Sequence, residues 1–335
     1  MVDISIIVPC YNEEATIRKL LDAICAQTVP MVDIEVVIAD GLSTDGTRAV
    51  INDYRREHPE LEVHIVDNTQ RVIPSGLNRA IEGARGSYIV RMDAHSIPDP
   101  DYIRKCVDEL KKGLGDNVGG IWKIHPGNSS WIARSIALAA AHPLGAGDAR
   151  YRIGGVAQEV ETVPFGTFHR DIFEQIGMFD ESLLTNEDYE FNTRIRQSGG
   201  KVWLDPSITS IYYARPTLRE LAAQYWRYGY WKAQMLRKYP KTLRWRQAIP
   251  PVFVAVLIIL GLLVVGMSLA RWLLAIIVIL YTIILLGIGI QMSLQHKKMS
   301  YIIGVPLALA TIQIAWGAAF LWGMFRKPAL NTKPL

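Results

Sequence analysis

The segment YIVRMDAHS, residues 88–96, is a short apolar run that ends abruptly in polar side chains, and it indicates the kind of sheet that this chain builds. Three further runs share this character: ISIIVP (4–9), IEVVIAD (34–40) and VHIVDN (63–68). Helical patterns over residues 13–27 and 43–58 separate the first three runs. Strands that alternate with helices of this length predict an α/β fold with helices on both faces of a parallel sheet.

The second helical pattern begins with STDG, residues 43–46. Ser43 and Thr44 are the N-cap candidates, because their hydroxyl groups can accept a hydrogen bond from the first turn. Asp45 then falls in the first turn, where the positive end of the helix dipole favours an acid.

Ligands of open α/β sheets bind beyond the carboxyl ends of the strands. Here three of those ends are polar: PCYNEE (9–14), ADGLSTDGT (39–47) and MDAH (92–95). A dinucleotide-binding fold would place a Gly-x-Gly-x-x-Gly turn after its first strand. This chain has Pro9, Tyr11 and Asn12 there, which argues against NAD or FAD.

The composition changes after about residue 247. The runs 249–270 and 272–292 are almost entirely apolar over more than the roughly 18 residues that indicate a bilayer span, and the run 301–325 is similar. Lys and Arg cluster in RKYPKTLRWRQ (237–247), just before the first run, and such residues tend to remain cytoplasmic. Three spans would then place Arg326 and Lys327 on the outer side, against this tendency.

Other features of the composition narrow the setting. The N-terminus has no basic leader and no long apolar core, so no secretory signal is expected. The three cysteines, Cys10, Cys25 and Cys106, lack metal-ligand spacing and indicate structural thiols in a reducing compartment. The net charge of +4 is modest and suggests no nucleic-acid partner. We therefore predict a multi-pass protein of the inner (plasma) membrane with a cytoplasmic N-terminal domain.

Four motifs occur in a characteristic order: SIIVPCYNEEATI (5–17), ADGLSTDGT (39–47), DAHS (93–96) and GMFDESLLTNEDYEFNTRIRQSGGKVWLDP (177–206). Together they resemble the inverting family 2 glycosyltransferases with the GT-A fold, over residues 3–230. Within that family the resemblance is closest to membrane-attached bacterial glycosyltransferases of the succinoglycan exopolysaccharide type. It implies a GT-A, Rossmann-like mixed sheet with helices on both faces.

The resemblance and the composition together predict the domain organisation. We expect a cytoplasmic GT-A domain over 1–216, an amphipathic interfacial segment over 217–247, a transmembrane region of about three helices over 248–326, and a tail over 327–335.

The metal site is implied by the family's Asp-x-Asp motif, which is Asp93-Ala94-His95 here. The resemblance implies that Asp93 and His95 hold a divalent ion that bridges two phosphate oxygens, with Ala94 beside the nucleotide. Because imidazole replaces the last carboxylate, Mn²⁺ is favoured over Mg²⁺. The alternative is a turn, in which Asp93 accepts turn hydrogen bonds and His95 acts as a cap.

The nucleotide site is implied at the first two strand ends. By resemblance, Pro9, Tyr11 and Glu13 contact the base and ribose, and Asp40 binds the uracil edge. The family usually has two adjacent acids at this second strand end, whereas Gly41 follows Asp40 here. For Tyr11 and Glu13 the alternative is a capped helix start with a packed ring.

The catalytic base is implied by TNEDYE, residues 185–190. The resemblance assigns Asp188 as the general base that deprotonates the acceptor hydroxyl, with Glu187 as its neighbour. The alternative is that both acids only complement the dipole of a helix start.

Two segments are implied to contact the acceptor or the diphosphate. PFGTFHR (164–170), which contains Gly166 and Thr167, matches the acceptor-lining stretch of the family, and Gln224, Arg227 and Tyr228 resemble the Gln-x-x-Arg-Trp motif of processive synthases. The alternative for the second segment is an interfacial helix anchored at the lipid headgroups by Trp226, Tyr230 and Trp231.

The predicted function is transfer of a sugar from a nucleotide-diphosphate sugar, expected to be a UDP-sugar, to a polyprenyl-diphosphate-linked saccharide in exopolysaccharide assembly. One alternative is a polyprenyl-phosphate glycosyltransferase of the dolichyl-phosphate mannose synthase type, and another is a processive polysaccharide synthase. A membrane-tethered nucleotide-sugar binding module without turnover is a further alternative, but the acidic motif at 187–188 argues against it.

Overall fold

The computed structural model describes residues 2–326, and these residues divide into two compact units. Among them, the first unit contains 2–123 and 154–212, and the second contains 124–153 and 213–326. The sequence did not indicate that 124–153 leaves the first unit. The predicted tail, 327–335, lies outside the described residues.

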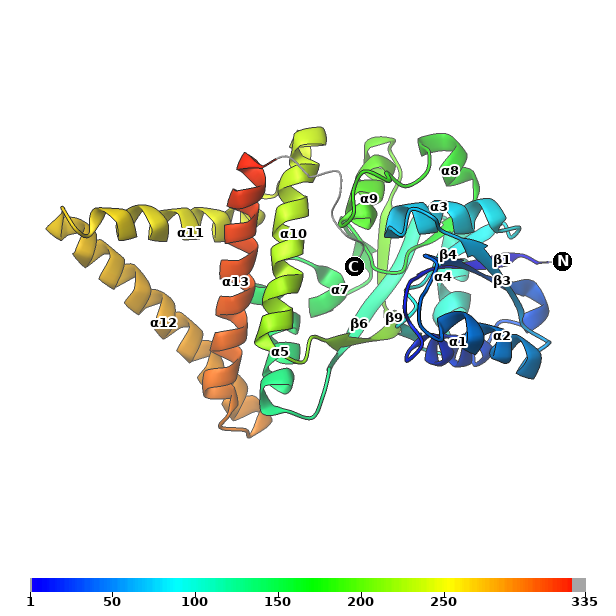
Figure 1. Cartoon of the computed structure of the whole chain (residues 1–335), viewed down its shortest axis with the longest axis horizontal. Helices are drawn as coiled ribbons and strands as arrows, with labels where there is room; N and C mark the ends of the chain where they lie inside the picture. Colours follow the sequence, from blue (N-terminus) through cyan, green and yellow to red (C-terminus); the bar gives the residue numbers. More distant parts are fainter. Residues whose placement is uncertain (1, 327–335) are drawn as a thin grey trace. The chain divides into compact units, whose positions relative to one another are not determined.

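Four parallel strands form one half of the sheet of the first unit (Figure 1). They are β1 (Ile4–Cys10), β2 (Ile34–Asp40), β3 (Glu62–Asp67) and β4 (Tyr88–Arg91). β1 lies between β2 and β4, and β3 pairs with β2 at the edge. Every residue of β2 is buried, and only Pro9 of β1 is partly exposed. Burial on both faces explains why these strands are continuously apolar.

Antiparallel strands form the other half. These are β5 (Ile97–Pro98), β6 (Asn117–Pro126), β7 (Gln158–Glu159), β8 (Thr167–His169) and β9 (Val202–Ala214). β8 pairs antiparallel with β4 and β6, and β9 pairs antiparallel with β5 and β7. In the described chain the order is β3-β2-β1-β4-β8-β6-β9-β5, with β7 beside β9. The predicted mixed, Rossmann-like sheet is confirmed.

Helices cover both faces of the parallel strands, with α3 on one face and α1 and α2 on the other (Figure 1). The helices of this unit are α1 (Ile17–Cys25), η1 (Met31–Asp33), α2 (Thr47–Glu57), α3 (Ile73–Gly83), α4 (Tyr102–Lys111), α8 (Asp171–Ile176) and α9 (Glu187–Gln197). α1 buries Ile17, Leu20, Leu21 and Ile24, which lie on one face of the helix.

The helix α2 begins later than predicted. It starts at Thr47, so the assignment of Ser43 or Thr44 as the N-cap is wrong. The reason is a long-range contact: the backbone N–H of Asn12 donates to Ser43 Oγ at 2.8 Å, and the N–H of Thr44 donates to Asn12 Oδ1 at 2.8 Å. Asp45 precedes the helix instead of lying in its first turn, and its Oδ1 accepts from the Thr47 N–H at 3.0 Å.

The second unit consists mainly of helices. They are α5 (Trp131–Ala141), α6 (Pro143–Ala146), α7 (Arg150–Ile153), α10 (Leu218–Lys238), η2 (Pro240–Thr242), α11 (Trp245–Leu263), α12 (Ser268–His296) and α13 (Tyr301–Phe325). Three of them, α11, α12 and α13, are long and apolar enough to cross a membrane.

The helix α10 covers most of the predicted interfacial segment. It packs along α13, because Gly229 has no side chain: a Cβ there would lie 2.2 Å from the Trp316 carbonyl oxygen. Of the aromatic residues expected at the headgroups, Trp226 is exposed, whereas Trp231 is buried inside the protein. Part of the apolar surface of α10 is therefore covered by protein and not by lipid.

A buried carboxyl group makes the stability of the first unit sensitive to pH. Glu109 of α4 lies near Asp205 of β9, and burial, together with that carboxylate, raises the pKa of Glu109 to about 7. This value exceeds that of the unfolded chain, so the stabilisation by protonated Glu109 is complete below about pH 4.5 and is lost as pH rises through about 7. We expect the melting temperature of the full chain in detergent to fall between about pH 6 and about pH 8, and Glu109→Gln to reduce that fall.

The matched control is Glu82→Gln, which removes an exposed carboxylate paired with Arg79. Melting curves recorded by tryptophan fluorescence across this pH range would separate the two variants. Identical pH dependence in Glu109→Gln and in the unsubstituted chain would contradict the prediction.

Candidate active site

The carboxyl ends of β1, β2 and β4 lie together at one edge of the sheet. In the strand register, Cys10 lies opposite Asp40, and Ile7 lies opposite Arg91. The loops that follow these strands therefore leave the sheet at the same edge. This is the edge at which α/β proteins bind ligands, and the predicted nucleotide and metal residues all lie on it or in its loops.

The loops after β1 and β2 are held to each other by hydrogen bonds. Besides the two bonds of Asn12, the N–H of Glu13 donates to Thr47 Oγ1 at 2.8 Å. Gly41 lies against the ring of Tyr11, and a Cβ at Gly41 would be 3.1 Å from Tyr11 Cδ2. A second acid at position 41 would crowd that ring.

Asp40 is fully buried and already has partners. Its carboxylate accepts from the Ser43 N–H at 3.0 Å and from Arg48 Nε at 2.5 Å. Arg48 also donates to Asp67 at 2.5 Å. A contact between Asp40 and uracil would require a change of partner at this carboxylate, and the assignment stays a prediction.

The loop after β4 contains both a turn and projecting side chains. The backbone carbonyl of Asp93 closes the turn by accepting from the N–H and the hydroxyl of Ser96 at 2.9 and 2.8 Å. The carboxylate of Asp93 does not make these turn bonds. His95 Nδ1 lies 3.1 Å from Glu13 Oε1, which joins the β4 loop to the β1 loop. The side chains of Asp93 and His95 thus point toward other groups of the site.

A buried arginine organises the centre of this edge. Arg91, the last residue of β4, donates to Glu187 at 2.9 Å, to Asp93 at 3.2 Å, and to Asp188. Its side chain is only 4% exposed. Burial by itself would lower the pKa of Arg91, but Asp93 and Glu187 outweigh it and raise the pKa. The guanidinium therefore remains charged. The sequence analysis did not single out Arg91; the one available signal was a cation at the end of an apolar strand.

The predicted base and its neighbour lie at the start of α9. Asn186 precedes the helix with φ 70°, and Glu187 and Asp188 occupy its first turn. Glu187 is buried, whereas about a third of the Asp188 side chain is exposed. One guanidinium donates to both acids, and a role limited to complementing the helix dipole does not account for these two bonds. Asp188 is thus the more exposed acid of the pair, and its role as the base stays a prediction.

The charges at this centre match a divalent ion. Asp93, Glu187 and Asp188 carry three formal negative charges and Arg91 carries one positive charge, which leaves −2. Carboxylate and imidazole suit Mn²⁺ among the common divalent ions. The residue types at Asp93 and His95 are therefore compatible with the predicted metal, and their assignment as ligands stays a prediction.

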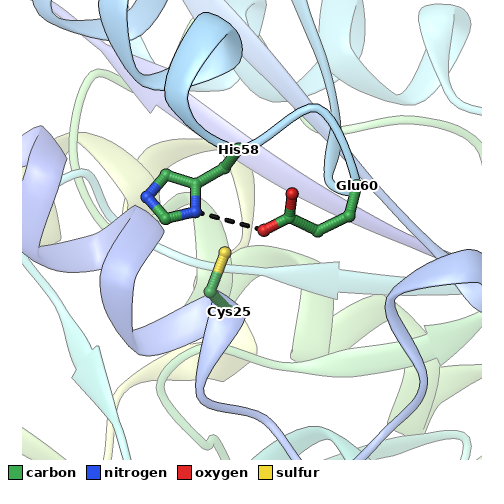
Figure 2. Close-up of side chains that lie close together, drawn as sticks. All are labelled: Cys25, His58 and Glu60. Atoms are coloured by element: carbon green, nitrogen blue, oxygen red, sulfur yellow. Dashed lines mark hydrogen bonds and ion pairs between the residues drawn. The ribbon is translucent and has the colours of Figure 1, made fainter.

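Two other groups of potential metal ligands occur in the described residues, and neither includes Asp93 or His95. The first, in Figure 2, contains Cys25, His58 and Glu60, with His58 Nδ1 3.1 Å from Glu60 Oε1. These residues lie at the ends of α1 and α2 and before β3, at the amino edge of the parallel strands. Burial raises the pKa of the Cys25 thiol, whose sulfur accepts from the Tyr54 hydroxyl at 3.3 Å. A protonated thiol is a poor metal ligand.

The second group contains Glu35, Glu62 and His64, also at the amino edge. Arg85 pairs with Glu35 at 2.8 Å and with Glu62 at 2.5 Å. A guanidinium therefore already neutralises these carboxylates, and the group serves the fold and not the donor site.

The predicted acceptor residues are more dispersed. Gly166 accepts from the Arg91 N–H at 2.9 Å through its carbonyl, and Thr167 is fully buried in β8. In the second unit, Gln224 donates to the Tyr228 hydroxyl at 3.0 Å across one turn of α10, near the half-buried Arg227. Their contacts with an acceptor stay predictions.

Comparison with known proteins identifies the family. Residues 5–177 match the profile described as Glycosyl transferase family 2. The chain belongs to glycosyl transferase family 2. It is 29% identical over 317 residues to succinoglycan biosynthesis protein ExoA of Rhizobium meliloti (strain 1021), covering 94% of this chain and 93% of that protein.

A second relative is dolichyl N-acetyl-alpha-D-glucosaminyl phosphate 3-beta-D-2,3-diacetamido-2,3-dideoxy-beta-D-glucuronosyltransferase of Methanococcus voltae. It is 31% identical over 245 residues, which cover 70% of this chain and 74% of that enzyme. Among solved structures, the chain is similar to mannosyltransferase PcManGT from Pyrobaculum calidifontis, in complex with GDP-Man and Mn²⁺. The TM-score is 0.66 at 22% identity, over 95% of this chain and 87% of that one, and it confirms the GT-A fold.

Arg91 can be tested by a substitution that keeps its charge. Lysine cannot present the planar fork that reaches three carboxylates at once. We expect Arg91→Lys to lower kcat for sugar transfer by at least about 10-fold, because the acids it positions lose their alignment, and to change donor KM by a smaller factor. Steady-state kinetics of the full chain in detergent would measure both constants.

Arg85→Lys is the matched control, since Arg85 also joins two carboxylates but lies at the opposite edge of the sheet. It should lower the melting temperature and leave kcat near the unsubstituted value. A normal kcat in Arg91→Lys, or an equal loss in both variants, would remove the positioning role.

Proposed function

We propose that this family 2 glycosyltransferase moves a sugar, with inversion, from a UDP-sugar to a polyprenyl-diphosphate-linked saccharide in exopolysaccharide assembly. The observation that carries the proposal is the set of three acids around Arg91, contributed by β4 and α9. The names of the two curated relatives, one for succinoglycan biosynthesis and one for a dolichyl-linked acceptor, support it.

The donor would bind at the carboxyl ends of β1, β2 and β4. Tyr11 offers a ring for base stacking, and Glu13 and Asp40 offer carboxylates for the ribose and the base. Pro9 and Ala94, both at strand ends, would contact the nucleotide through apolar surface. We favour UDP because of Asp40, although the similar mannosyltransferase structure contains GDP-Man. Exchange of UDP-sugars for GDP-sugars in a binding assay decides between them.

The leaving diphosphate requires neutralisation of its charge. Asp93 and His95 would hold a divalent ion, with Mn²⁺ favoured, which when bound stabilises the phosphate oxygens as a Lewis acid. Glu13 keeps the His95 imidazole oriented through its contact with Nδ1. Such outer partners fix the ring of a ligating histidine.

Asp188 would accept the proton of the acceptor hydroxyl as that oxygen attacks the anomeric carbon of the sugar. Its bond to Arg91 fixes the direction of the carboxylate. One base and no protein nucleophile imply a single displacement, and therefore an inverted anomeric centre. Glu187 is buried behind it and is proposed to orient Arg91 and not to act on the acceptor.

The acceptor is proposed to be lipid-linked because the catalytic unit continues directly into apolar helices. α10 contains Gln224, Arg227 and Tyr228, which we assign to the acceptor or diphosphate, with Gly166 and Thr167 assigned to the acceptor side of the sheet. An inner-membrane location with the catalytic unit in the cytoplasm fits the Lys and Arg residues before α11.

One experiment separates this acceptor from the alternatives. A strain that lacks the protein should accumulate a polyprenyl-diphosphate saccharide one sugar short, detectable by mass spectrometry. The purified full chain should extend it when supplied with a UDP-sugar. Glycosylation of polyprenyl phosphate itself would instead support the dolichyl-phosphate mannose synthase type, and addition of many sugars would support a processive synthase.

The base assignment predicts a specific kinetic defect. Asp188→Asn keeps the shape and hydrogen bonding of the side chain but removes the proton acceptor. We expect kcat to fall at least about 10²-fold, with UDP-sugar binding nearly unchanged. Kinetics and isothermal titration of donor binding would measure the two effects.

The control for a dipole effect is Asp171→Asn, which removes an exposed acid from the first turn of α8. It should leave kcat unaltered. If Asp188→Asn kept most of its turnover, the base would lie elsewhere, with Glu187 next in line.

The metal assignment predicts a change of ion preference. Activity should disappear in chelator and return more fully with Mn²⁺ than with Mg²⁺. His95→Asp replaces imidazole by the harder carboxylate and should shift the preference toward Mg²⁺. Electron paramagnetic resonance of bound Mn²⁺ would show weaker Mn²⁺ binding in this variant. Full activity in chelator would refute the assignment.

A further inference from the structure

Three helices are apolar enough to cross a membrane, but α13 differs from the other two. In the most apolar 18-residue windows, 44% of α13 is buried inside the protein, against 11% for α11 and 11% for α12. The exposed large apolar side chains of α13 are Ile303, Leu307, Ile314, Trp322, Met324 and Phe325, and four of them, Ile303, Leu307, Ile314 and Phe325, share one face at helical spacing. We call these four residues the exposed face of α13.

The beginning of α13 packs on the end of α12 and on α5. A Cβ at Gly289 of α12 would lie 2.5 Å from the Ile302 carbonyl oxygen. A Cβ at Gly304 would lie 2.1 Å from Ser135 Oγ of α5. Because α5 precedes every apolar helix long enough to span, the first turns of α13 lie beside a part of the chain that has not yet entered a membrane.

The middle of α13 makes the decisive contact. Gln313 Nε2 donates to the carbonyl oxygen of Leu144, in α6, at 3.0 Å. The Tyr281 hydroxyl, which reaches Gln313 from the middle of α12, donates to Gln313 Oε1 at 2.8 Å. If α13 crossed the bilayer, Gln313 would lie near its centre, about 15 Å from either surface of the hydrocarbon core. The short helix α6 would then have to lie at that depth as well.

The second half of α13 approaches the beginning of α11. A Cβ at Gly317 would lie 2.5 Å from the carbonyl oxygen of Pro250, in the second turn of α11. The last turn then meets the end of α10: Gln234 donates to the Gly323 carbonyl at 2.9 Å, and Arg237 donates to the Met324 carbonyl at 2.8 Å. These side chains satisfy carbonyl groups that a helix end leaves unpaired.

These contacts fix the direction of α13 within the second unit. α11 and α12 form a hairpin, and the link between them is closed by Arg271, whose Nε donates to the Val264 carbonyl at 2.8 Å. α13 starts at the end of α12 and finishes beside the start of α11, so it joins the two open ends of the hairpin. Figure 1 shows α11 and α12 meeting at a tip away from α13, which runs alongside α10.

We propose that α13 does not cross the bilayer but lies along its cytoplasmic surface beside α10, with its exposed face on the lipid. Only α11 and α12 then cross. Both ends of α13 lie on the side at which α10 enters α11, which is the cytoplasmic side by its Lys and Arg content. The C-terminal end of α13 therefore stays in the cytoplasm, and Arg326 no longer violates the charge rule that three spans would break.

The lipid leaflet is the occupant that the contacts favour for the exposed face. A second copy of the chain would need a polar rim around an apolar patch. The helices α11 and α12, which pack against α13, instead expose large apolar side chains along most of their length. A helix with one apolar exposed face and one face against protein suits the boundary between headgroups and acyl chains.

Cysteine labelling tests the proposal in the full chain. In a Cys25→Ser background, Cys10 and Cys106 are buried and should not react. Single cysteines would be introduced as Arg326→Cys, as Lys298→Cys for the cytoplasmic control, and as Gly266→Cys in the α11–α12 link for the outer control. A membrane-impermeant maleimide would be added to intact spheroplasts and to inside-out vesicles.

We expect Arg326→Cys to react like Lys298→Cys, in inside-out vesicles and not in spheroplasts, while Gly266→Cys shows the opposite pattern. Labelling of Arg326→Cys in spheroplasts would overturn the proposal and establish a third span. If position 326 were unreactive from both sides, C-terminal fusions would decide. A fluorescent green fluorescent protein fusion supports the proposal. A non-fluorescent one, together with an active alkaline phosphatase fusion at the same position, overturns it.

Discussion

The candidate active site depends on a single buried positive charge. Placing the Arg91 guanidinium in the interior is unfavourable unless carboxylates surround it, and Asp93, Glu187 and Asp188 all do so. Two of these acids come from almost 100 residues later in the chain. The requirement to neutralise Arg91 therefore holds the start of α9 against the end of β4, and the proposed base is placed by that requirement.

A second ion pair holds α9 one to two turns further along the helix. Arg194 donates to Glu190 at 2.6 Å within the helix and to the Ile176 carbonyl oxygen at 2.6 Å after α8. Glu190 is fully buried, so loss of its bond to Arg194 would leave a buried carboxylate without a partner and lower the stability of the fold. Rotation of α9 about its axis would break both sets of contacts. Asp188, the proposed general base, is thus held on a rigid helix.

The sequence predicted the parallel strands well, because a strand buried on both faces must be apolar throughout, and few other structures need that pattern. It failed where a contact crosses long distances in the chain. Ser43 was assigned to a helix cap because its bond to Asn12 is invisible in local sequence. Arg91 was missed because a cation at a strand end is ordinarily exposed. The sequence did not assign residues 124–153 to the second unit. A short apolar helix such as α5 has the composition of a buried helix in either unit, so its sequence alone does not tell the two apart.

The apolar helices illustrate the same limit in another form. The composition of a helix predicts whether its surroundings are apolar. The space around its glycines shows whether another helix packs there. Gly261 of α11 and Gly287 of α12 have nothing within 4 Å of an added Cβ, whereas Gly304, Gly317 and Gly323 of α13 would each place one at 2.9 Å or less from another helix. Small residues at such spacing allow close helix packing. Much of the apolar surface of α13 therefore contacts other helices of the second unit, and its apolar sequence does not by itself indicate a bilayer span.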